Sequence, residues 1–436
     1  MVTRAEVLAG VPDGLRLPAG EVLDWVLGQG CPVGEVAGYD MLQFVWYGLP
    51  TKWMVDEGEL AELTAAAAAV MEAAGRGGVA GVIRSGDTPV VQRAWRSDRA
   101  VAVGLFERAM AGCGYGPPDT ELLVWGSVMG VVEVGVHAGV ARVLERAIED
   151  GVVVVGRPGW RRVQAGLAEA WLSTPSLAHG GRRPVEVVHA ERRQAWLRSR
   201  APAHRLVLEA VLPLLDAPPE SVEVPAEVEV EVAGSLRWLL ARVGDGLVLT
   251  PAGYLPTAVV AEAKQLWFGD WQLPGFVMRS ESDLPPLMIL REFARRAKLL
   301  TRRGRRLTVS KLGRTALADP GQWLPTVAAA WFSGADIEVY AAEVAAALML
   351  QNTPAERLLA LATEALAPRF RHRDGSPADR RDVEHAVWEW LRPGNSMGLI
   401  AYDRHLGGEN TLTASGRAAA ILGLRLRAHA PLTHPG

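Results

Sequence analysis

A dense group of basic residues lies between positions 291 and 314. It consists of Arg291, Arg295, Arg296, Lys298, Arg302, Arg303, Arg305, Arg306, Lys311 and Arg314, and Glu292 is the only acidic residue in this span. Guanidinium and ammonium groups bind phosphate oxygens, and each such contact contributes about one unit to the salt dependence of nucleic-acid binding. The first nine of these residues are therefore the candidate nucleic-acid ligands of the chain.

The basic group also has a plain structural explanation. Lys52, Lys264, Lys298 and Lys311 are the only lysines, so nearly all of the 46 basic residues are arginines, as expected for a GC-rich bacterial genome. Arginine-rich tips are ordinary solvated surface in such a proteome, and the whole chain has a net charge of only −3. The leading hypothesis is a DNA-associated regulator, and the alternative is a non-enzymatic protein-interaction scaffold.

Three other patterns have weaker claims to chemistry. The run from Gly75 to Ala80 matches the GxGxxA form of a dinucleotide fingerprint, but it follows an alanine-rich helix and is better explained as a helix C-cap. Trp46, Tyr47 and Trp53 favour core packing over a ligand pocket. The glutamates of residues 223–231 alternate with apolar residues and predict a strand with one solvated acidic face.

Local catalytic and cofactor motifs do not occur in the sequence. No GxxxxGK[ST], GxSxG or HExxH string is present, and the nine histidines are scattered. Cys31 and Cys113 are the only cysteines and have no CxxC partner, which argues against a disulfide framework or a zinc site. We therefore predict no cofactor, no metal and no catalytic residue, although distant residues could still meet to form an enzyme site.

The basic group is positioned by a predicted order of short elements. Helices at 235–243 and 256–267 flank a strand at 247–249, and Ser282 or Asp283 is expected to cap a third helix. Leu287, Leu290, Phe293 and Ala294 form its buried stripe, so the charged residues are expected to face outward. Two apolar segments joined through Gly304 then predict a β-hairpin with arginines at its tip.

A similar order follows in the last hundred residues. Helices are expected at 337–349, 354–367 and 377–391, then a hairpin from 398–402 and 411–413, and a closing helix at 417–427. Leu307-Thr308 with Gly313, and Leu412-Thr413 with Gly416, also resemble Leu249-Thr250 with Gly253, which indicates an internal repeat. In the first part of the chain, helices are expected at 55–74, 118–132, 136–150 and 160–172, and two more at 185–199 and 203–216.

The predicted fold is mainly α, with an N-terminal helical bundle followed by two winged-helix-like modules with short β-hairpins. The predicted domains are a helical domain at 1–175, a helical connector with the acidic strand at 176–234, modules at 235–330 and 335–428, and a tail at 429–436. Residues 1–180 contain 14 basic and 21 acidic residues. The remainder is net basic, so a polyanion is expected to meet the C-terminal half.

Residues 235–330 carry the runs GDGLVLTPAGYLPTAVV and SDLPPLMILREFARRAKLLTRRGRRLTVSKLGRTALADP. These resemble the C-terminal region of uncharacterised bacterial proteins named after an open reading frame of an Ri plasmid. The resemblance implies a fold and no activity. Residues 336–428, through GLIAYDRHLGGENTLTASGRAAAI, resemble bacterial winged-helix modules of the helix-turn-helix class, and the N-terminal region resembles no known family.

The localisation of the protein is predicted from the absence of membrane and secretion signals in the sequence. No run of about 18 apolar residues is present, and residues 1–15 lack the apolar segment of a secretory signal. We therefore expect a cytoplasmic protein with no membrane contact. Its expected partner is DNA or another protein, and the pattern is compatible with a homo-oligomer.

Overall fold

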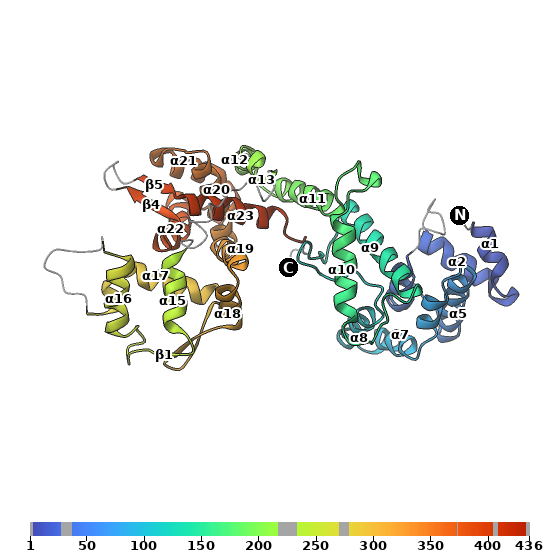
Figure 1. Cartoon of the computed structure of the whole chain (residues 1–436). Coiled ribbons are helices and arrows are strands. Elements are labelled where there is room, and N and C mark those ends of the chain that lie inside the picture. The colour runs from blue at the N-terminus through green and yellow to red at the C-terminus, as the bar shows by residue number, and fades with distance from the viewer. Residues whose placement is uncertain are drawn as a thin grey trace. The chain divides into compact units, whose positions relative to one another are not determined.

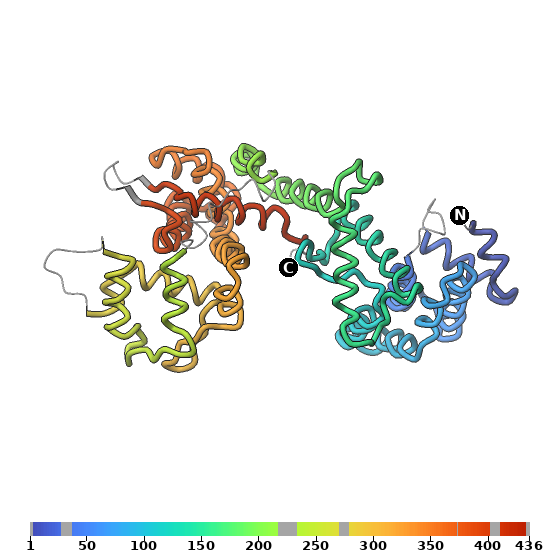
Figure 2. Tube along the Cα trace, viewed as in Figure 1, coloured from blue at the N-terminus to red at the C-terminus, as the bar shows by residue number. Residues whose placement is uncertain are grey.

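The computed structural model describes residues 3–27, 37–216, 233–269, 279–372, 374–403 and 409–432 (Figures 1 and 2). The described part is mainly helical and contains two small antiparallel sheets. The chain divides into two compact units, residues 1–192 with 431–436 and residues 193–430. The division lies inside a helix near residue 192, whereas the sequence predicted a boundary near residue 175. Both predicted hairpin modules belong to the second unit.

The first unit consists of helices packed around an alanine-rich core. Its elements are α1 (Arg4–Gly10), η1 (Asp13–Leu15), α2 (Arg16–Leu27), α3 (Gly38–Gln43), the π-helical turn η3 (Phe44–Gly48), α4 (Leu49–Lys52), α5 (Glu57–Ala73), α6 (Gly77–Ile83), α7 (Asp87–Ser97), α8 (Arg99–Gly112), α9 (Val131–Glu149), α10 (Trp160–Ser173), η4 (Leu177–His179) and the start of α11 (Pro184–Arg198). Helix α5 begins with a capping box between Asp56 and Glu59. Its buried alanines let α2 and α6 approach closely.

The helix predicted at 118–132 is wrong. Residues 117–130 are irregular, because local side chains satisfy the backbone there. Asp119 accepts the N–H of Trp125 at 2.9 Å, and Thr120 accepts the N–H of Leu123 at 3.1 Å. The N–H of Val128 then donates to the carbonyl of Leu432 at 3.2 Å, so the C-terminal segment packs into the first unit.

The second unit contains the rest of α11 and all remaining elements. They are α12 (Pro202–Glu209), α13 (Leu212–Asp216), α15 (Gly234–Val243), β1 (Leu247–Val248), α16 (Thr257–Trp267), η6 (Glu281–Asp283), α17 (Pro285–Arg296), β2 (Leu300–Arg303), β3 (Arg306–Val309), α18 (Lys311–Ala318), α19 (Pro320–Trp331), α20 (Asp336–Leu350), α21 (Ala355–Leu366), η7 (Ala367–Arg369), α22 (Arg380–Ser396), β4 (Ile400–Asp403), β5 (Glu409–Leu412) and α23 (Ala414–Ala428). The single helix predicted at 203–216 is divided into α12 and α13, because Pro213 has no N–H to donate to the preceding turn.

The sheet of the first hairpin module has three strands in the order β1-β3-β2. Leu300 pairs with Val309 and Leu247 pairs with Leu307, so the short strand after α15 joins the hairpin. The predicted caps of the third helix are wrong. Ser280 caps the short η6 instead, and α17 begins at Pro285 in the position where a missing N–H costs least.

The two hairpins repeat the same backbone hydrogen bonds. The residues that correspond to each other differ from those that the sequence pattern predicted. The N–H groups of Leu299 and Leu399 both donate to the preceding helix at 2.9 Å, and their carbonyls accept from Ser310 at 2.9 Å and Thr413 at 3.1 Å. Thr413 therefore corresponds to Ser310 and not to Thr308. The next helix starts in the same way in both modules, because each of these hydroxyls accepts an N–H three residues later.

Two predicted features cannot be compared with the structure. The acidic strand at 223–231 and the last four residues of the predicted tail lie outside the described residues. Among the residues that are described, no helix combines the length and the apolar character needed to cross a membrane.

Candidate nucleic-acid interface

Helix α17 is positioned by the apolar stripe that its sequence predicted. Leu287, Leu290, Phe293 and Ala294 are all buried, and they pack α17 against α15, β2 and η6. The stripe recurs at three- and four-residue spacing, so it covers one side of the helix. The opposite side carries the charged residues, with one exception.

Arg291 is the exception, and its expected outward orientation is wrong. Its side chain is 8% exposed, its Nε lies 2.9 Å from Glu281 Oε1, and its Nη1 donates to the carbonyl of Gly253 at 2.8 Å. Burial raises the pKa of Glu281, although the N–H of Leu255 and Arg291 favour the ionised form. The spacing already contained this signal, because Arg291 is four residues after Leu287 and three before Ala294. Arg291 is therefore a structural residue.

Arg295 and Arg296 lie on the exposed side of α17, and each has an acidic neighbour. Arg295 Nη1 lies 3.2 Å from Glu292 on the same helix, and Arg296 Nη1 lies 4.0 Å from Glu389 of α22. Both arginine side chains remain more than two-fifths exposed. Their charge is partly compensated, so they add less to an anion site than the sequence implied.

The hairpin β2–β3, here called the wing, carries the rest of the basic group. Arg302 Nε donates to the carbonyl of Gly304 at 2.7 Å, and Arg305 donates to the carbonyl of Leu249 at 3.0 and 2.7 Å. Arg306 donates to the carbonyl of Asp245 at 3.2 Å. The side chain of Arg303 is exposed and has no hydrogen-bond or ion-pair partner among the described residues.

A close backbone contact fixes the side chain of Arg306. A Cβ at Gly246 would lie 2.3 Å from Arg306 Nε, so the glycine lets this guanidinium lie directly on the backbone. Lys298 stands in the left-handed region at φ 56°, at the turn between α17 and the wing. Lys298 and Lys311 are exposed, one at each end of the hairpin.

The electrostatics of the wing follow from these partners. Within the described part of the chain, no carboxylate oxygen lies within 4.0 Å of a cationic nitrogen of Lys298, Lys311 or the wing arginines. A backbone carbonyl orients a guanidinium without removing its positive charge. The wing therefore presents four guanidinium groups whose charge is not neutralised by a neighbouring acid.

A second helix covers part of the remaining face of α17. Helix α17 packs against α22, which is the third helix of the second hairpin module (Figure 1). Trp390 of α22 is buried and stacks on Trp331 of α19, with ring centroids 4.4 Å apart. The scaffold hypothesis predicts that another domain covers this helix, but helix periodicity identifies only an apolar face and did not identify α22 as its partner.

The weaker sequence candidates have structural roles. Gly75 has φ 81° and ends α5, and the N–H of Arg76 donates to the carbonyl of Met71 at 2.8 Å, as in a helix C-cap. Trp46 is 1% exposed and donates its indole N–H to Thr88 at 2.8 Å, so the aromatic run belongs to the core. The residues that the structure describes contain no group of three or more potential metal ligands.

A buried ionic cluster surrounds Glu343 of α20, and no sequence pattern indicated it. This carboxylate is fully buried and accepts from Trp196 Nε1 at 3.0 Å and from Arg200 Nε and Nη2 at 2.8 Å each. His204 Nε2 and Arg427 Nε lie 3.4 and 3.2 Å away. Burial alone would raise the pKa of Glu343, but the contacts with His204, Arg200 and Trp196 outweigh it and lower the pKa to about 2.

The cluster links elements that are far apart in the sequence, and its carboxylate is closed to solvent. Its members lie in α11, in α12, between these two helices, in α20 and in α23, so no local motif could reveal it. The oxygens of its carboxylate already accept hydrogen bonds from several donors. The cluster therefore holds elements of the second unit together and is not a candidate binding group.

The wing thus presents a group of exposed arginines that have no acidic neighbour among the described residues. Comparisons of the whole chain with protein-family models, curated proteins and solved structures find no match.

Proposed function

We propose that the second unit is a nucleic-acid-associated body of two winged-helix modules, which contacts phosphates through the wing. The observation that carries the proposal is the exposed, uncompensated charge of Arg302, Arg303, Arg305 and Arg306. Guanidinium groups match phosphate groups well, because two N–H donors can meet two oxygens. A wing of this kind commonly contacts the backbone of a duplex.

The module assignment is supported by the order of elements. Helix, strand, two helices and a hairpin follow one another from α15 to β3, and the short strand β1 pairs with the second strand of the hairpin. The second module repeats the helices and the hairpin closure from α20 to β5. The winged-helix assignment accounts for the order of helices and strands in both modules.

The proposed contact does not read base sequence. In winged-helix proteins, the third helix usually carries the residues that reach base edges. Here the third helix α17 packs against α22, and its two exposed arginines have acidic neighbours. The proposed binding therefore rests on phosphates and depends strongly on salt.

The test is a comparison of two fourfold variants by fluorescence anisotropy on a labelled DNA duplex at several salt concentrations. We expect the wing variant R302A/R303A/R305A/R306A to bind at least tenfold more weakly at low salt. We also expect its salt slope to fall by about two to four units, since each lost phosphate contact removes roughly 0.9. A second duplex of unrelated sequence should give the same affinities.

The control variant is R99A/R108A/R157A/R162A, which makes the same charge change on exposed residues of the first unit. It should bind as the unmodified protein does. Equal affinity of the two variants would reject the wing as the contact surface. A strong preference for one duplex sequence would reject phosphate contact as its basis.

A second candidate function is a protein-interaction scaffold, favoured by the packing of α17 on α22. In this case the third helices hold the two modules together, and the outer surfaces bind a protein. Purified protein would then be free of nucleic acid by its absorbance ratio, and the wing variant would retain the duplex affinity of the control. Recovery of a defined protein partner that the wing variant no longer binds would establish this alternative.

A further inference from the structure

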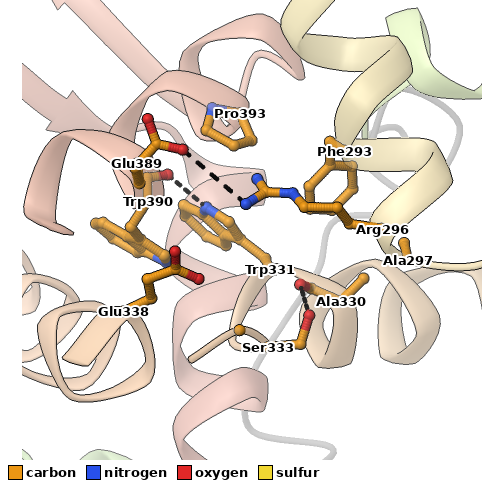
Figure 3. Close-up of a pocket in the computed structure, with 11 residues that line it drawn as sticks. Phe293, Arg296, Ala297, Ala330, Trp331, Ser333, Glu338, Glu389, Trp390 and Pro393 are labelled. Atoms are coloured by element: carbon orange, nitrogen blue, oxygen red, sulfur yellow. Dashed lines mark hydrogen bonds and ion pairs between the residues drawn. The ribbon is translucent and has the colours of Figure 1, made fainter. Parts of the chain in front are cut away.

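A cavity of about 260 Å³ lies inside the second unit, where the two hairpin modules meet (Figure 3). Its walls come from α17, the end of α19, the start of α20 and α22. Cavities for drug-sized ligands have volumes of roughly 300–1,000 Å³. This cavity therefore suits a smaller organic molecule.

One wall contains a buried donor without a partner. Trp331 Nε1 donates to the carbonyl of Trp390 at 2.9 Å, whereas Trp390 Nε1 has no hydrogen-bond partner in the described part of the chain. Trp390 is 3% exposed. Buried N–H groups in folded proteins nearly always find an acceptor, so this indole marks a place where an acceptor is missing.

A second wall contains a carboxylate without a counter-charge. Glu389 lies 3.2 Å from Arg392 and 4.0 Å from Arg296, so its charge is matched. Glu338 is half-buried and has no cation within 4.0 Å among the described residues. Figure 3 shows the Trp390 ring and the Glu338 carboxylate next to each other on the cavity wall.

The backbone holds Glu338 in this position. Glu338 Oε2 accepts the N–H of Ala335 at 3.1 Å. A Cβ at Gly334 would lie 2.2 Å from the same oxygen, and Gly334 has φ 148°, so only glycine leaves room for the carboxylate here. The second carboxylate oxygen is not used by this cap. The cavity thus combines an unmatched anion, an unmatched N–H and an apolar wall from Phe293, Ala297 and Pro393.

We infer that the cavity binds a small organic ammonium ion with a hydroxyl group next to the ammonium and an apolar body. The ammonium pairs with Glu338, and the hydroxyl oxygen accepts the N–H of Trp390. The apolar body covers Phe293 and the neighbouring apolar side chains. Aromatic rings next to the carboxylate add to the attraction for a cation. This inference is independent of the nucleic-acid proposal, since the wing contributes no residue to the cavity.

The test uses phenylalaninol, which carries all three groups, and isothermal titration calorimetry on the full chain. We expect binding of one molecule per chain. Phenethylamine lacks the hydroxyl and should bind a few-fold more weakly, and phenylpropanol lacks the ammonium and should bind at least tenfold more weakly. Phenylpropionate carries the opposite charge and should not bind.

Two isosteric variants assign the binding to the cavity. E338Q removes the charge but keeps an oxygen to cap Ala335, and we expect it to bind phenylalaninol about tenfold more weakly, which corresponds to about 1.4 kcal/mol. E356Q makes the same change at an exposed position of α21 and should bind as the unmodified protein does. Absence of binding, equal losses in both variants, or tighter binding of phenylpropionate than of phenylalaninol would each overturn the inference.

Discussion

The two hairpin modules of the second unit close their hairpins in the same way, but the strands of the hairpins differ in their charged residues. Leu299 and Leu399 occupy the same hydrogen-bonding position in the two modules. Strands β2 and β3 contain Arg302, Arg303 and Arg306, whereas β4 and β5 contain Asp403 and Glu409. The shared backbone indicates a structural requirement. The charge of the strands differs between the modules, so the nucleic-acid contact that we propose involves only the first hairpin.

The modules also differ in how they hold a buried glutamate. Glu281 of the first module accepts from Leu255 and pairs with Arg291, and burial raises its pKa. Glu343 of the second module contacts His204, Arg200 and Trp196, which lower its pKa to about 2. The same residue type is thus strained toward the neutral form in one module and stabilised as an anion in the other.

The largest effect is expected from E343Q. The variant leaves Arg200, which is about as buried as Glu343, without a carboxylate, and loss of one partner of a buried ion pair costs about 3–5 kcal/mol. Urea unfolding of the unmodified protein and the variant at pH 7 measures this loss. A loss below about 1 kcal/mol would mean that the cluster does not clamp the second unit.

The pH dependence separates the two glutamates. Because the pKa of Glu343 is lowered from 4.5, its contribution to stability is present above pH 4.5 and is lost as the pH falls toward 2. The deficit of E343Q should therefore shrink at acid pH. Because the pKa of Glu281 is raised, its contribution is present below 4.5 and is lost as the pH rises, so the deficit of E281Q should be largest at acid pH. Deficits that change in the same direction would contradict this difference.

The next largest effect is expected from alanine at the glycines that follow each hairpin. A Cβ at Gly416 would lie 1.7 Å from the carbonyl oxygen of Leu399, and a Cβ at Gly313 would lie 2.5 Å from that of Leu299. Both substitutions should destabilise the second unit by about 1–3 kcal/mol, with G416A the more severe. Thermal unfolding measures both losses.

Gly166 in α10 provides the control, because an added Cβ meets no atom within 4 Å there. G166A should be neutral or slightly stabilising, as expected for alanine on a helix. If G313A and G416A behave like G166A, the shared hairpin closure is not a packing requirement.

The smallest effect on folding is expected from R303A. Arg303 is exposed and has no partner among the described residues, so its removal should change the free energy of unfolding by less than about 0.5 kcal/mol. Chemical denaturation measures this change, and duplex affinity is measured on the same sample. A large loss of stability would show that the wing charge serves the fold.

Local patterns predicted the elements of the site but not its surroundings. The stripe from Leu287 to Ala294 and the glycine of the hairpin are local signals, and both were interpreted correctly. The inward orientation of Arg291 was also contained in the spacing, but its charge was given more weight than its position. The packing of α17 on α22 and the cluster at Glu343 join distant segments. Such pairings depend on tertiary structure, which a single sequence does not specify residue by residue.

The contact between Val128 and Leu432 has a consequence for how the protein is made. A ribosome completes the second unit before it releases the residues that finish the first. The first unit therefore lacks the contact between Val128 and Leu432 until the second unit has been synthesised. Truncation at residue 430 would leave the later-made unit intact and damage the earlier-made one.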